Sequence, residues 1–291
     1  MNSSDKQIPY TLLDFGGGRK LERFGNFLFD RPSPSADGTE KKNASLWKNT
    51  DFRFISENKK NNSERGQWLP DTPKHFTLSF NLFSLELQGT PFGHLGVFPE
   101  QIPNWQRIRH LIKNTVKPAS ARPLRVLNLF AYTGGSSLAA ADSNTEVVHI
   151  DSSESIVKRA KCNAELNGIT SGIRFIAEDA RRFVKREIKR NNRYDAVILD
   201  PPSYGHGTKS EVWQLEKHLP ELLDGIAVLL NENPVFLLLT AHTPSYGSGV
   251  LADMLSSAGL CRMFSKAETF QTDILSEQGL PLFCGDGVLL S

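Results

Sequence analysis

Apolar residues are spaced in two different ways along this chain, and the spacing changes near residue 95. Before that point the apolar runs are short and are broken by glycines, prolines and polar tracts. They include 10–15, 24–29 and 76–87. Short alternating runs bounded by turn residues are typical of strands. We therefore expect a small strand-rich domain over residues 1–95 and a second domain over residues 96–291.

The second domain alternates between a helical and a strand-like hydrophobic period. Residues 105–115 place Trp105, Ile108 and Ile112 on one side of a helix, and strand-like and helix-like runs alternate from Leu124 onward. The expected strands are 124–130, 145–150, 172–176, 194–199, 234–240, 260–267 and 282–290, and the expected helices are 135–141, 153–167, 179–190, 209–230 and 247–258. This alternation predicts an α/β fold in which helices cover both faces of a mostly parallel sheet. The last strand has no helix before it, which predicts one antiparallel strand near an edge of a seven-stranded, Rossmann-like sheet.

The composition indicates the general class of protein but not a binding partner. The chain has 291 residues, of which 39% are hydrophobic, and a formal net charge of +2. This hydrophobic fraction is ample for a packed core, and a nearly neutral chain gives no global signal of polyanion binding. No apolar run approaches the roughly 18–20 residues that a membrane-spanning helix needs, so we expect a soluble cytoplasmic protein. The sequence does not indicate an oligomeric state.

The junction between the first expected strand and its helix, residues 128–137, carries two adjacent glycines. Gly134 and Gly135 lack the Cβ atoms that keep a ligand away from the backbone, although many strand-to-helix turns use glycine for conformational reasons alone. Asp151 ends the second strand, where a cofactor site places an acid against ribose hydroxyls; its alternative role is a helix N-cap. Asp179 ends the third strand and can accept from an adenine amino group or cap the next helix. The acids thus favour a nucleotide-like cofactor.

The fourth expected strand runs into Asp200-Pro-Pro-Ser-Tyr204, the most specific motif of the chain. Two prolines hold the backbone extended and remove two N–H donors, which leaves carbonyl groups free to accept hydrogen bonds. Asp200 and the Pro201 carbonyl can then bind the edge of a planar amine or base, and Tyr204 can stack on its ring. A purely structural turn is the alternative. We predict Asp200, Pro201, Pro202 and Tyr204 as the catalytic residues.

Together these segments resemble class I S-adenosylmethionine-dependent methyltransferases. The resemblance is carried by 128–135, Asp151, 163–168, Asp179 and 200–204, and it covers most of the chain from about residue 10. Within that class, the chain is similar to bacterial proteins related to the large-subunit (23S) rRNA methyltransferases that modify cytosine C5 or guanine N7. The stretches that carry this closer similarity are 13–25, 93–101 and 200–219. The resemblance implies a class I methyltransferase sheet and S-adenosylmethionine as the cofactor.

By this resemblance, individual residues take particular parts of the cofactor. Residues 130–135 would surround the methionine part, Asp151 the ribose, and Asp179 with Ala180 the adenine, while residues 97–101 would pack beside the site. The implied cofactor-binding residues are Phe98, Gln101, Phe130, Ala131, Tyr132, Thr133, Gly134, Gly135, Asp151, Ser152, Asp179, Ala180 and Asp200. A nicotinamide enzyme fits less well, because the glycines lack the three-glycine spacing of a dinucleotide-binding turn.

The expected chemistry is direct transfer of a methyl group to nitrogen or, as a second choice, to oxygen. A sulfonium methyl is already activated, so the protein mainly needs to align an acceptor lone pair behind the methyl carbon. Methylation of cytosine C5 also needs a cysteine that attacks the ring. In family members with that chemistry the thiol lies at the end of the fifth strand, which here reads Leu239-Thr-Ala-His-Thr243. We expect Cys162, Cys261 and Cys284 to be buried apolar residues, and the target not to be cytosine C5.

Two basic stretches, residues 107–125 and 181–190, form a candidate RNA surface. Both can contact phosphates, although solvated helix faces look the same in a sequence. We expect an RNA substrate on the strength of the resemblance. Methylation of a protein amide, DNA or a small amine is the alternative, and a non-catalytic cofactor- or RNA-binding protein is a further one. The histidines lack metal-binding spacing, so we expect no metal, and the roles of His206 and His242 stay open.

Overall fold

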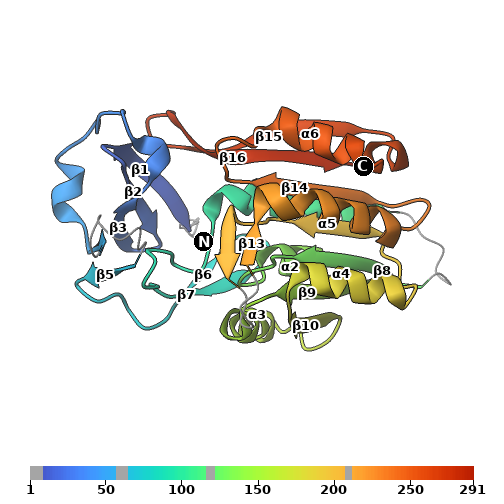
Figure 1. Ribbon diagram of the computed structural model, residues 1–291. Helices are drawn as coiled ribbons and strands as arrows, with labels where there is room; N and C mark the ends of the chain where they lie inside the picture. Colours follow the sequence, from blue (N-terminus) through green and yellow to red (C-terminus); the bar gives the residue numbers. More distant parts are fainter. Residues whose placement is uncertain (1–8, 57–64, 116–121, 207–211) are drawn as a thin grey trace. The chain divides into compact units, whose positions relative to one another are not determined.

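The computed structural model describes residues 9–56, 65–115, 122–206 and 212–291 (Figure 1). The chain forms two compact units, one comprising Met1–Glu100 and Asp273–Cys284, the other Gln101–Thr272 and Gly285–Ser291. The expected boundary at residue 95 differs from this division mainly because residues 273–284 belong with the N-terminal unit. Within the described ranges, no helix is long and apolar enough to cross a lipid bilayer.

The second unit is built on a seven-stranded sheet in the order β10-β9-β8-β11-β14-β16-β15. Its strands are β8 (Leu124–Leu129), β9 (Thr145–Asp151), β10 (Ile173–Ala177), β11 (Ala196–Leu199), β14 (Phe236–Ala241), β15 (Ala267–Leu275) and β16 (Pro281–Leu290). Strands β8, β9, β10, β11 and β14 run parallel, and β16 runs antiparallel to β14. The chain starts at β8 in the middle of the sheet, moves out to β10, and then returns past β8 to β11. The predicted α/β, Rossmann-like sheet with one antiparallel strand near an edge is therefore confirmed.

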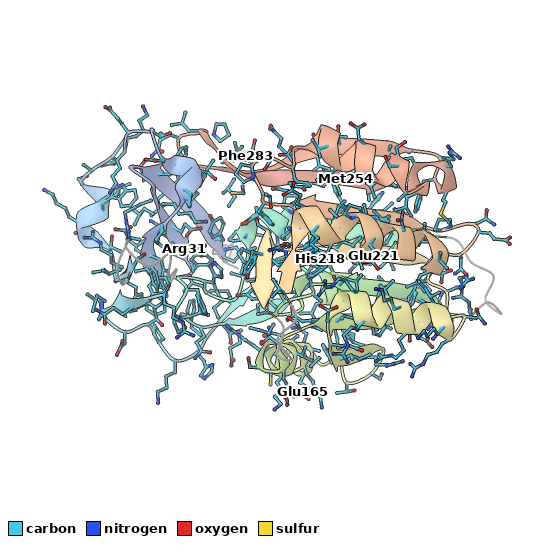
Figure 2. All side chains as sticks on the ribbon, viewed as in Figure 1. Arg31, Glu165, His218, Glu221, Met254 and Phe283 are labelled. Atoms are coloured by element: carbon cyan, nitrogen blue, oxygen red, sulfur yellow. The ribbon has the colours of Figure 1, made fainter. Side chains whose placement is uncertain are left out.

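Helices pack around this sheet and bury its central strands. They are α1 (Ile102–Asn114), α2 (Gly135–Ala140), α3 (Glu154–Leu166), α4 (Ala180–Lys189), α5 (Leu215–Leu229) and α6 (Ser248–Ser257). Helices α4, α5 and α6 lie in a row, and their apolar side chains fill the space beside β8, β11 and β14 (Figures 1 and 2). Strands β11 and β14 are buried along their whole length, as expected for central parallel strands. This packing fixes the strand ends that carry the candidate site.

The strand expected at residues 260–267 is wrong. The segment Leu260–Met263 is instead a 3₁₀ helix, and β15 begins only at Ala267. Gly259 has a φ of 74°, a left-handed conformation that suits glycine, and it turns the chain at the end of α6. Leu260 is fully buried and packs in the same core as the apolar residues of α4, α5 and α6. The apolar run that resembles a strand in the sequence therefore serves helix packing.

The helix expected at residues 209–230 begins later than predicted, at Leu215. Just before it, β13 (Val212–Gln214) pairs in antiparallel fashion with β12 (Tyr204–His206). Residues 212–214 are therefore strand and not helix, and residues 209–211 of the expected helix lie outside the described part of the structure. The pairing of β12 with β13 matters for the site, because β13 carries an aromatic residue, Trp213.

The N-terminal unit contains a five-stranded sheet in the order β1-β2-β3-β4-β5 and a separate hairpin of β6 and β7. These strands are β1 (Tyr10–Gly16), β2 (Arg19–Phe24), β3 (Phe27–Pro32), β4 (Phe52–Ser56), β5 (Gly66–Leu69), β6 (Phe76–Ser79) and β7 (Ser84–Leu87), with 3₁₀ helices at Pro34–Ala36 and Leu46–Asn49. A further 3₁₀ helix, Pro99–Gln101, includes the residues at which the first unit ends and the second begins. Gly17 and Gly18, with φ of 58° and 70°, form the turn between β1 and β2. The predicted strand-rich N-terminal region is confirmed.

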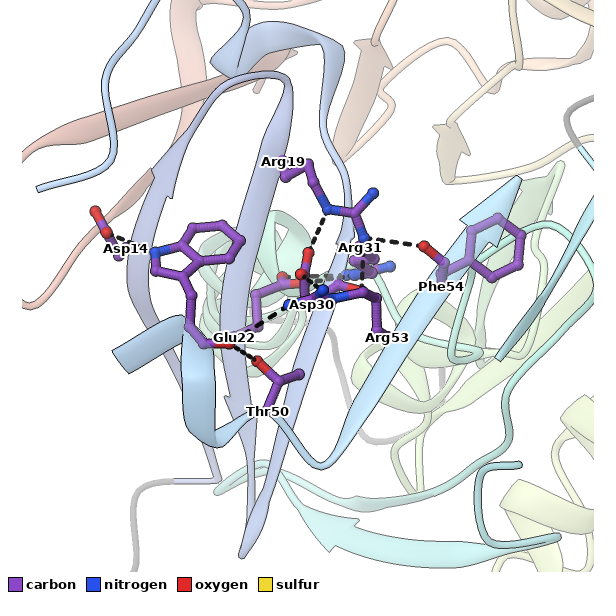
Figure 3. Close-up of polar contacts among 9 residues, drawn as sticks. Asp14, Arg19, Glu22, Asp30, Arg31, Thr50, Arg53 and Phe54 are labelled. Carbon is purple, nitrogen blue, oxygen red and sulfur yellow. Dashed lines mark hydrogen bonds and ion pairs between the residues drawn. The ribbon is translucent and has the colours of Figure 1, made fainter. Parts of the chain in front are cut away.

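Ion pairs are buried inside this small sheet (Figure 3). The guanidinium of Arg31 donates to both carboxylate oxygens of Glu22, and both side chains are almost fully buried. Tyr10 Oη donates to Glu22 Oε1 at 2.8 Å. Burial alone would raise the pKa of Glu22, but Arg31 and then Lys20 lower it to about 2. The carboxylate therefore stays charged inside the unit.

Candidate cofactor and acceptor site

The loop after β8 has an unusual backbone. Phe130 and Tyr132 have φ of 56° and 49°, and Gly134 has φ of 98°. Such angles in non-glycine residues cost on the order of 1–3 kcal/mol each and persist only where the surroundings hold them. Here the Ala131 N–H donates to the Ile150 carbonyl at 2.9 Å, and the Tyr132 N–H donates to Asp151 Oδ2 at 3.0 Å. The end of β9 therefore holds the loop in shape.

The two glycines of this loop have different reasons for being glycine. Gly134 has the left-handed conformation, and an added Cβ would lie 3.3 Å from the Ala160 Cβ. An added Cβ on Gly135 would lie 2.5 Å from the ring of Trp105, on α1. Close packing of α1 against the start of α2 thus explains Gly135, whereas the sequence suggested close approach of a ligand. Thr133 is buried, and its carbonyl accepts from Asn163 Nδ2 at 2.9 Å.

Asp151 uses both carboxylate oxygens on backbone amides. Oδ2 accepts from Tyr132, and Oδ1 accepts from the Ser153 N–H at 2.9 Å. The N-cap of α3 is Ser153, so Asp151 does not take the alternative role of helix cap. Burial raises the pKa of Asp151, and these two hydrogen bonds oppose the rise. A carboxylate has about four acceptor sites, so this side chain can still accept from ribose hydroxyls.

Asp179 does act as a helix cap. Its side chain accepts from the Arg182 N–H at 3.1 Å at the start of α4, and the Arg181 guanidinium donates to both of its oxygens. The cap and the adenine contact are compatible, because each occupies different lone pairs of the carboxylate. The structure therefore confirms the cap, which was one of the two roles expected for Asp179, and the adenine contact stays a prediction.

A pocket lies at the carboxyl ends of β8, β9 and β10, where these acids meet. Its walls are Phe130, Ile150, Asp151, Ser152, Glu178, Asp179, Ala180, Pro202, Gly205 and Trp213. Five of these were predicted as cofactor-binding residues from the sequence, namely Phe130, Asp151, Ser152, Asp179 and Ala180. Pro202 brings the Asp-Pro-Pro turn into the same wall. Phe130, the acids Asp151 and Asp179, and Pro202 of the acceptor turn (residues 200–204) therefore meet at one pocket. The other predicted cofactor-binding residues do not line it, namely Phe98, Gln101, Ala131, Tyr132, Thr133, Gly134, Gly135 and Asp200.

Trp213 is one of four wall residues that were not predicted from the sequence; the others are Ile150, Glu178 and Gly205. Trp213 lies on β13, with its ring 4.7 Å from that of Phe130, and its Nε1–H donates to the Pro202 carbonyl at 2.7 Å. The expected helix over residues 209–230 hid its role. A three-residue strand is too short to leave a periodic signal in the sequence.

Asp200 is held by three side-chain donors. Gln101 Nε2 donates to Oδ2 at 3.1 Å, Thr240 Oγ1 donates to Oδ1 at 2.6 Å, and His242 Nε2 lies 3.1 Å from Oδ1. Burial would raise the pKa of Asp200, but His242 and the hydrogen bonds from Thr240 and Gln101 lower it below its usual value. The side chain is 26% exposed, so a substrate can reach it. Asp200 is thus a fixed, ionised acceptor.

The donor role of Gln101 is set by its other neighbours. Asn104 Nδ2 donates to Gln101 Oε1 at 2.8 Å, and the Arg107 guanidinium donates to Asn104 Oδ1 at 3.0 Å. Gln101 therefore turns its NH₂ group toward Asp200. Phe98, predicted beside it, belongs to the N-terminal unit, where its ring lies 5.3 Å from that of His94.

Among the other residues of the acceptor turn, some are buried and others are exposed. Pro201 is buried, and Tyr204 is 53% exposed on β12, where it pairs with Gln214. Ser203 Oγ lies 2.6 Å from Thr243 Oγ1, which ties the turn to the end of β14. The side chain of His206 lies outside the described part of the structure. The turn thus carries an ionised carboxylate at its start and an exposed aromatic ring four residues later, which suits a planar polar acceptor.

The prediction that all three cysteines are buried is wrong. Cys162 is exposed, and Cys261 and Cys284 are partly exposed. Cys162 lies outside the face of α3 that Val157 and Ala160 bury, a placement that the mixed polarity of this helix does not reveal in the sequence. None of the three lines the pocket. The described residues contain no group of histidines, cysteines and acids that could hold a metal ion.

Many cations of the two basic stretches are used inside the fold. In the first stretch, Arg109 donates to the Leu138 and Ala141 carbonyls at the end of α2, and Arg122 pairs with Asp195. Pairs in the second stretch are Arg181 with Asp179, Lys185 with Glu221, Arg186 with Glu178 and Arg190 with Glu187. Lys117 lies outside the described residues. These pairs favour the structural interpretation of both stretches over a dedicated phosphate-binding face.

Three buried polar side chains are linked by hydrogen bonds between β8, α2 and β9, near the loop of residues 130–135. Asn128 Nδ2 donates to Ser137 Oγ, which lies 2.9 Å from His149 Nδ1. These contacts tie α2 to β8 and β9. His149 is fully buried, and burial lowers its pKa to about 3. The imidazole is therefore neutral at physiological pH in the folded protein.

Acidification is expected to destabilise the second unit through His149. In the unfolded chain His149 has the ordinary pKa of about 6.5 and takes up a proton below that pH. In the folded chain its pKa is about 3, so it stays neutral until the pH is that low. At pH 5 this difference amounts to about 2 kcal/mol. The free energy of unfolding of the wild type, measured in urea from pH 7.5 to 5, should fall by that much more than that of His149→Gln. Equal slopes for the two proteins would contradict the assignment.

Comparisons with known proteins agree with the class of protein that this sheet and its acids define. A family model described as S-adenosylmethionine-dependent methyltransferase matches residues 108–240. The crystal structure of a SAM-dependent methyltransferase from Agrobacterium tumefaciens is 31% identical, covers 99% of this chain and 92% of that one, and has a TM-score of 0.87. The chain belongs to the S-adenosylmethionine (SAM)-dependent methyltransferase family.

Two further relatives extend the comparison. The crystal structure of SMU.776, described by its resemblance to methyltransferases and solved as a complex with SAH (S-adenosylhomocysteine), has a TM-score of 0.68 and 16% identity, with coverage of 99% of this chain and 76% of that one. It supports the fold alone. The 23S rRNA (uracil(1939)-C(5))-methyltransferase RlmD of Neisseria lactamica is 28% identical over 220 residues, which is 72% of this chain. The chain spans only 44% of the length of that relative.

Proposed function

We propose that this protein transfers a methyl group from SAM to a nitrogen atom of a planar acceptor, and that the acceptor is a base in RNA. One observation carries the proposal: Pro202 of the acceptor turn lines the same pocket as Asp151, so the cofactor and the acceptor share a wall. The neighbouring Asp200 is ionised and partly exposed, which suits an acceptor group with hydrogen-bond donors.

The residues that line the pocket suit the adenosine part of SAM. Phe130, Ala180 and Trp213 give apolar walls for a purine, and Asp151 gives acceptors for two ribose hydroxyls. When bound, SAM supplies a methyl group already activated by its sulfonium. The loop of residues 130–135, with its positive φ angles, turns the backbone at the end of β8, where the methionine part is expected.

The contribution of Asp200 is to orient the acceptor. Its lowered pKa makes it a weak base, so it holds an N–H of the acceptor and stabilises the positive charge that develops on nitrogen. The proton then leaves to water. Tyr204, half exposed beside the turn, offers a ring on which a base can stack.

A nitrogen acceptor explains the residues better than pyrimidine C5. The name of the Neisseria lactamica relative specifies C5 of a uracil. Reaction at that carbon needs a nucleophile that attacks the ring, and a thiol is the usual one. The segment 239–243 contains no cysteine, and none of the three cysteines lines the pocket. The turn around Asp200 instead offers an acceptor for N–H groups.

RNA is the favoured class of substrate because the curated relatives are rRNA methyltransferases. Besides RlmD, the ribosomal RNA large subunit methyltransferase K of Neisseria meningitidis is 30% identical over 159 residues, which is 53% of this chain and 44% of that protein. The turn alone also suits a protein amide, a DNA base or a small amine. A non-catalytic cofactor-binding protein would keep the pocket but would not need an ionised, partly exposed Asp200.

Labelled methyl transfer tests the proposal. The protein is incubated with methyl-labelled SAM and with separated RNA, DNA, protein and metabolite fractions from a bacterial extract. We expect label in large-subunit rRNA, on a base nitrogen after nuclease digestion and mass spectrometry. Label in another fraction would change the substrate class, and 5-methylpyrimidine as the product would refute the nitrogen acceptor. Absence of label from every fraction, with SAH binding intact, would favour the non-catalytic alternative.

A further inference from the structure

Trp213 lies between the cofactor pocket and the acceptor turn. Its side chain is only 5% exposed, although it comes from a three-residue strand that follows the turn. One part of the indole forms a wall of the pocket beside Phe130, and its Nε1–H donates to the Pro202 carbonyl. A single rigid side chain thus contacts both halves of the proposed site.

The backbone around Trp213 is tied to the same two halves. Arg181, which pairs with Asp179, also donates to the Val212 carbonyl at 3.3 Å, and its guanidinium lies 6.0 Å from the Trp213 ring. On the other side, the Leu215 N–H donates to the Ser203 carbonyl at 3.0 Å. The position of β13 is therefore set by the adenine end of the pocket and by the acceptor turn together.

We propose that Trp213 is a positioning residue through which adenosine binding sets the geometry of the acceptor turn. The inference rests on the proposed function and deepens it. A purine bound in the pocket packs on the indole and fixes its plane, and the indole N–H then holds the Pro202 carbonyl, next to Asp200. The link consists of the purine packed on the indole and the hydrogen bond from the indole N–H to the Pro202 carbonyl, so it needs no movement of the sheet.

The variant Trp213→Phe separates the two contacts, because it keeps an aromatic wall and removes the N–H donor. We expect its Kd for SAH to stay within about threefold of wild type, whereas kcat at saturating SAM falls about tenfold, as for the loss of one buried hydrogen bond. Trp213→Leu removes both contacts and should weaken SAH binding as well. Wild-type kcat in Trp213→Phe would overturn the inference.

Trp68→Phe is a matched control. Trp68 is buried in the N-terminal unit, and its Nε1–H donates to the Thr90 carbonyl at 2.9 Å, so the variant loses the same kind of bond. We expect SAH and free adenosine to quench indole fluorescence in the wild type and in Trp68→Phe, but not in Trp213→Phe. Full quenching in Trp213→Phe would also overturn the inference.

A measurement on the wild type covers the case in which the variants fold poorly. The Leu215 N–H donates to the Ser203 carbonyl in the acceptor turn. Adenosine should slow hydrogen exchange of this amide, and homocysteine should not. Unchanged exchange with adenosine bound would contradict the link. If SAH does not bind the wild type at all, the proposed function itself fails, whereas SAH binding with a Trp213→Phe variant that behaves as wild type refutes only the role of Trp213.

Discussion

Replacing Asp200 by asparagine is expected to reduce kcat/KM for methyl transfer by about 100-fold or more, and to change the Kd for SAH by no more than a few-fold. The amide removes the negative charge that stabilises the developing positive charge on the acceptor nitrogen, an effect of the size seen when preorganised electrostatic groups are removed. It also places an NH₂ group among donors from Gln101, Thr240 and His242. The binding pocket itself does not include Asp200.

The control for this substitution is Asp253→Asn. Asp253 is exposed on α6, so the same chemical change there should leave activity and stability unaltered. Initial rates with the methylated fraction identified above, together with calorimetric titration of SAH, separate the two effects. A loss of SAH affinity parallel to the loss of activity would make Asp200 a cofactor-binding residue, as the family resemblance also implies. Unchanged rates would remove it from the acceptor site.

The positions of the acids in this site follow from sequence because a parallel sheet brings the carboxyl ends of its strands to one edge. Asp151 ends β9, Asp179 follows β10, and Asp200 follows β11. Apolar runs alone place those strand ends to within two residues. Strand order did not need to be known, since any doubly wound order leaves these ends on the same edge.

Residues that act through long-range packing were not predictable in the same way. Gln101 and Thr240 meet at Asp200 from distant parts of the chain, and only the fold shows that one donates to each carboxylate oxygen. Gly135 looks like a ligand contact in the sequence and is explained by the ring of Trp105 in the structure. Trp213 was hidden because a three-residue strand has no periodicity to read.

The division into units shows a second limit of sequence patterns. Residues 273–284 contain the end of β15, the turn after it and the start of β16, so their alternation looks like ordinary sheet in the sequence. Leu282 and Ile274 nevertheless pack with Leu12 and Phe15 in a core of the N-terminal unit. Alternation tells which face of a strand is buried but not which partner buries it.

Replacing Glu22 by glutamine is expected to lower the free energy of unfolding of the N-terminal unit by about 3–5 kcal/mol. Arg31 is only 4% exposed and donates to Glu22 through two nitrogens, so the variant leaves a buried guanidinium without its counter-charge (Figure 3). The effect has a defined pH window. Because the folded pKa of Glu22 is about 2 and its ordinary value is 4.5, the wild type loses this stabilisation as the pH falls from 4.5 toward 2, and the variant does not.

Two further variants make the Glu22 result specific, and urea unfolding followed by far-ultraviolet circular dichroism measures all of them. Glu86→Gln breaks an exposed pair with His75 in the same unit, and it should cost less than about 1 kcal/mol. The double variant Glu22→Leu with Arg31→Met removes both buried charges, and it should recover most of the lost stability, because the cost of the single change comes from the unpaired cation. If Glu22→Gln is no more destabilising than Glu86→Gln, the buried pair is not what holds this sheet together. If the double variant is worse than the single one, the packing of the Arg31 stem, and not its charge, carries the stability.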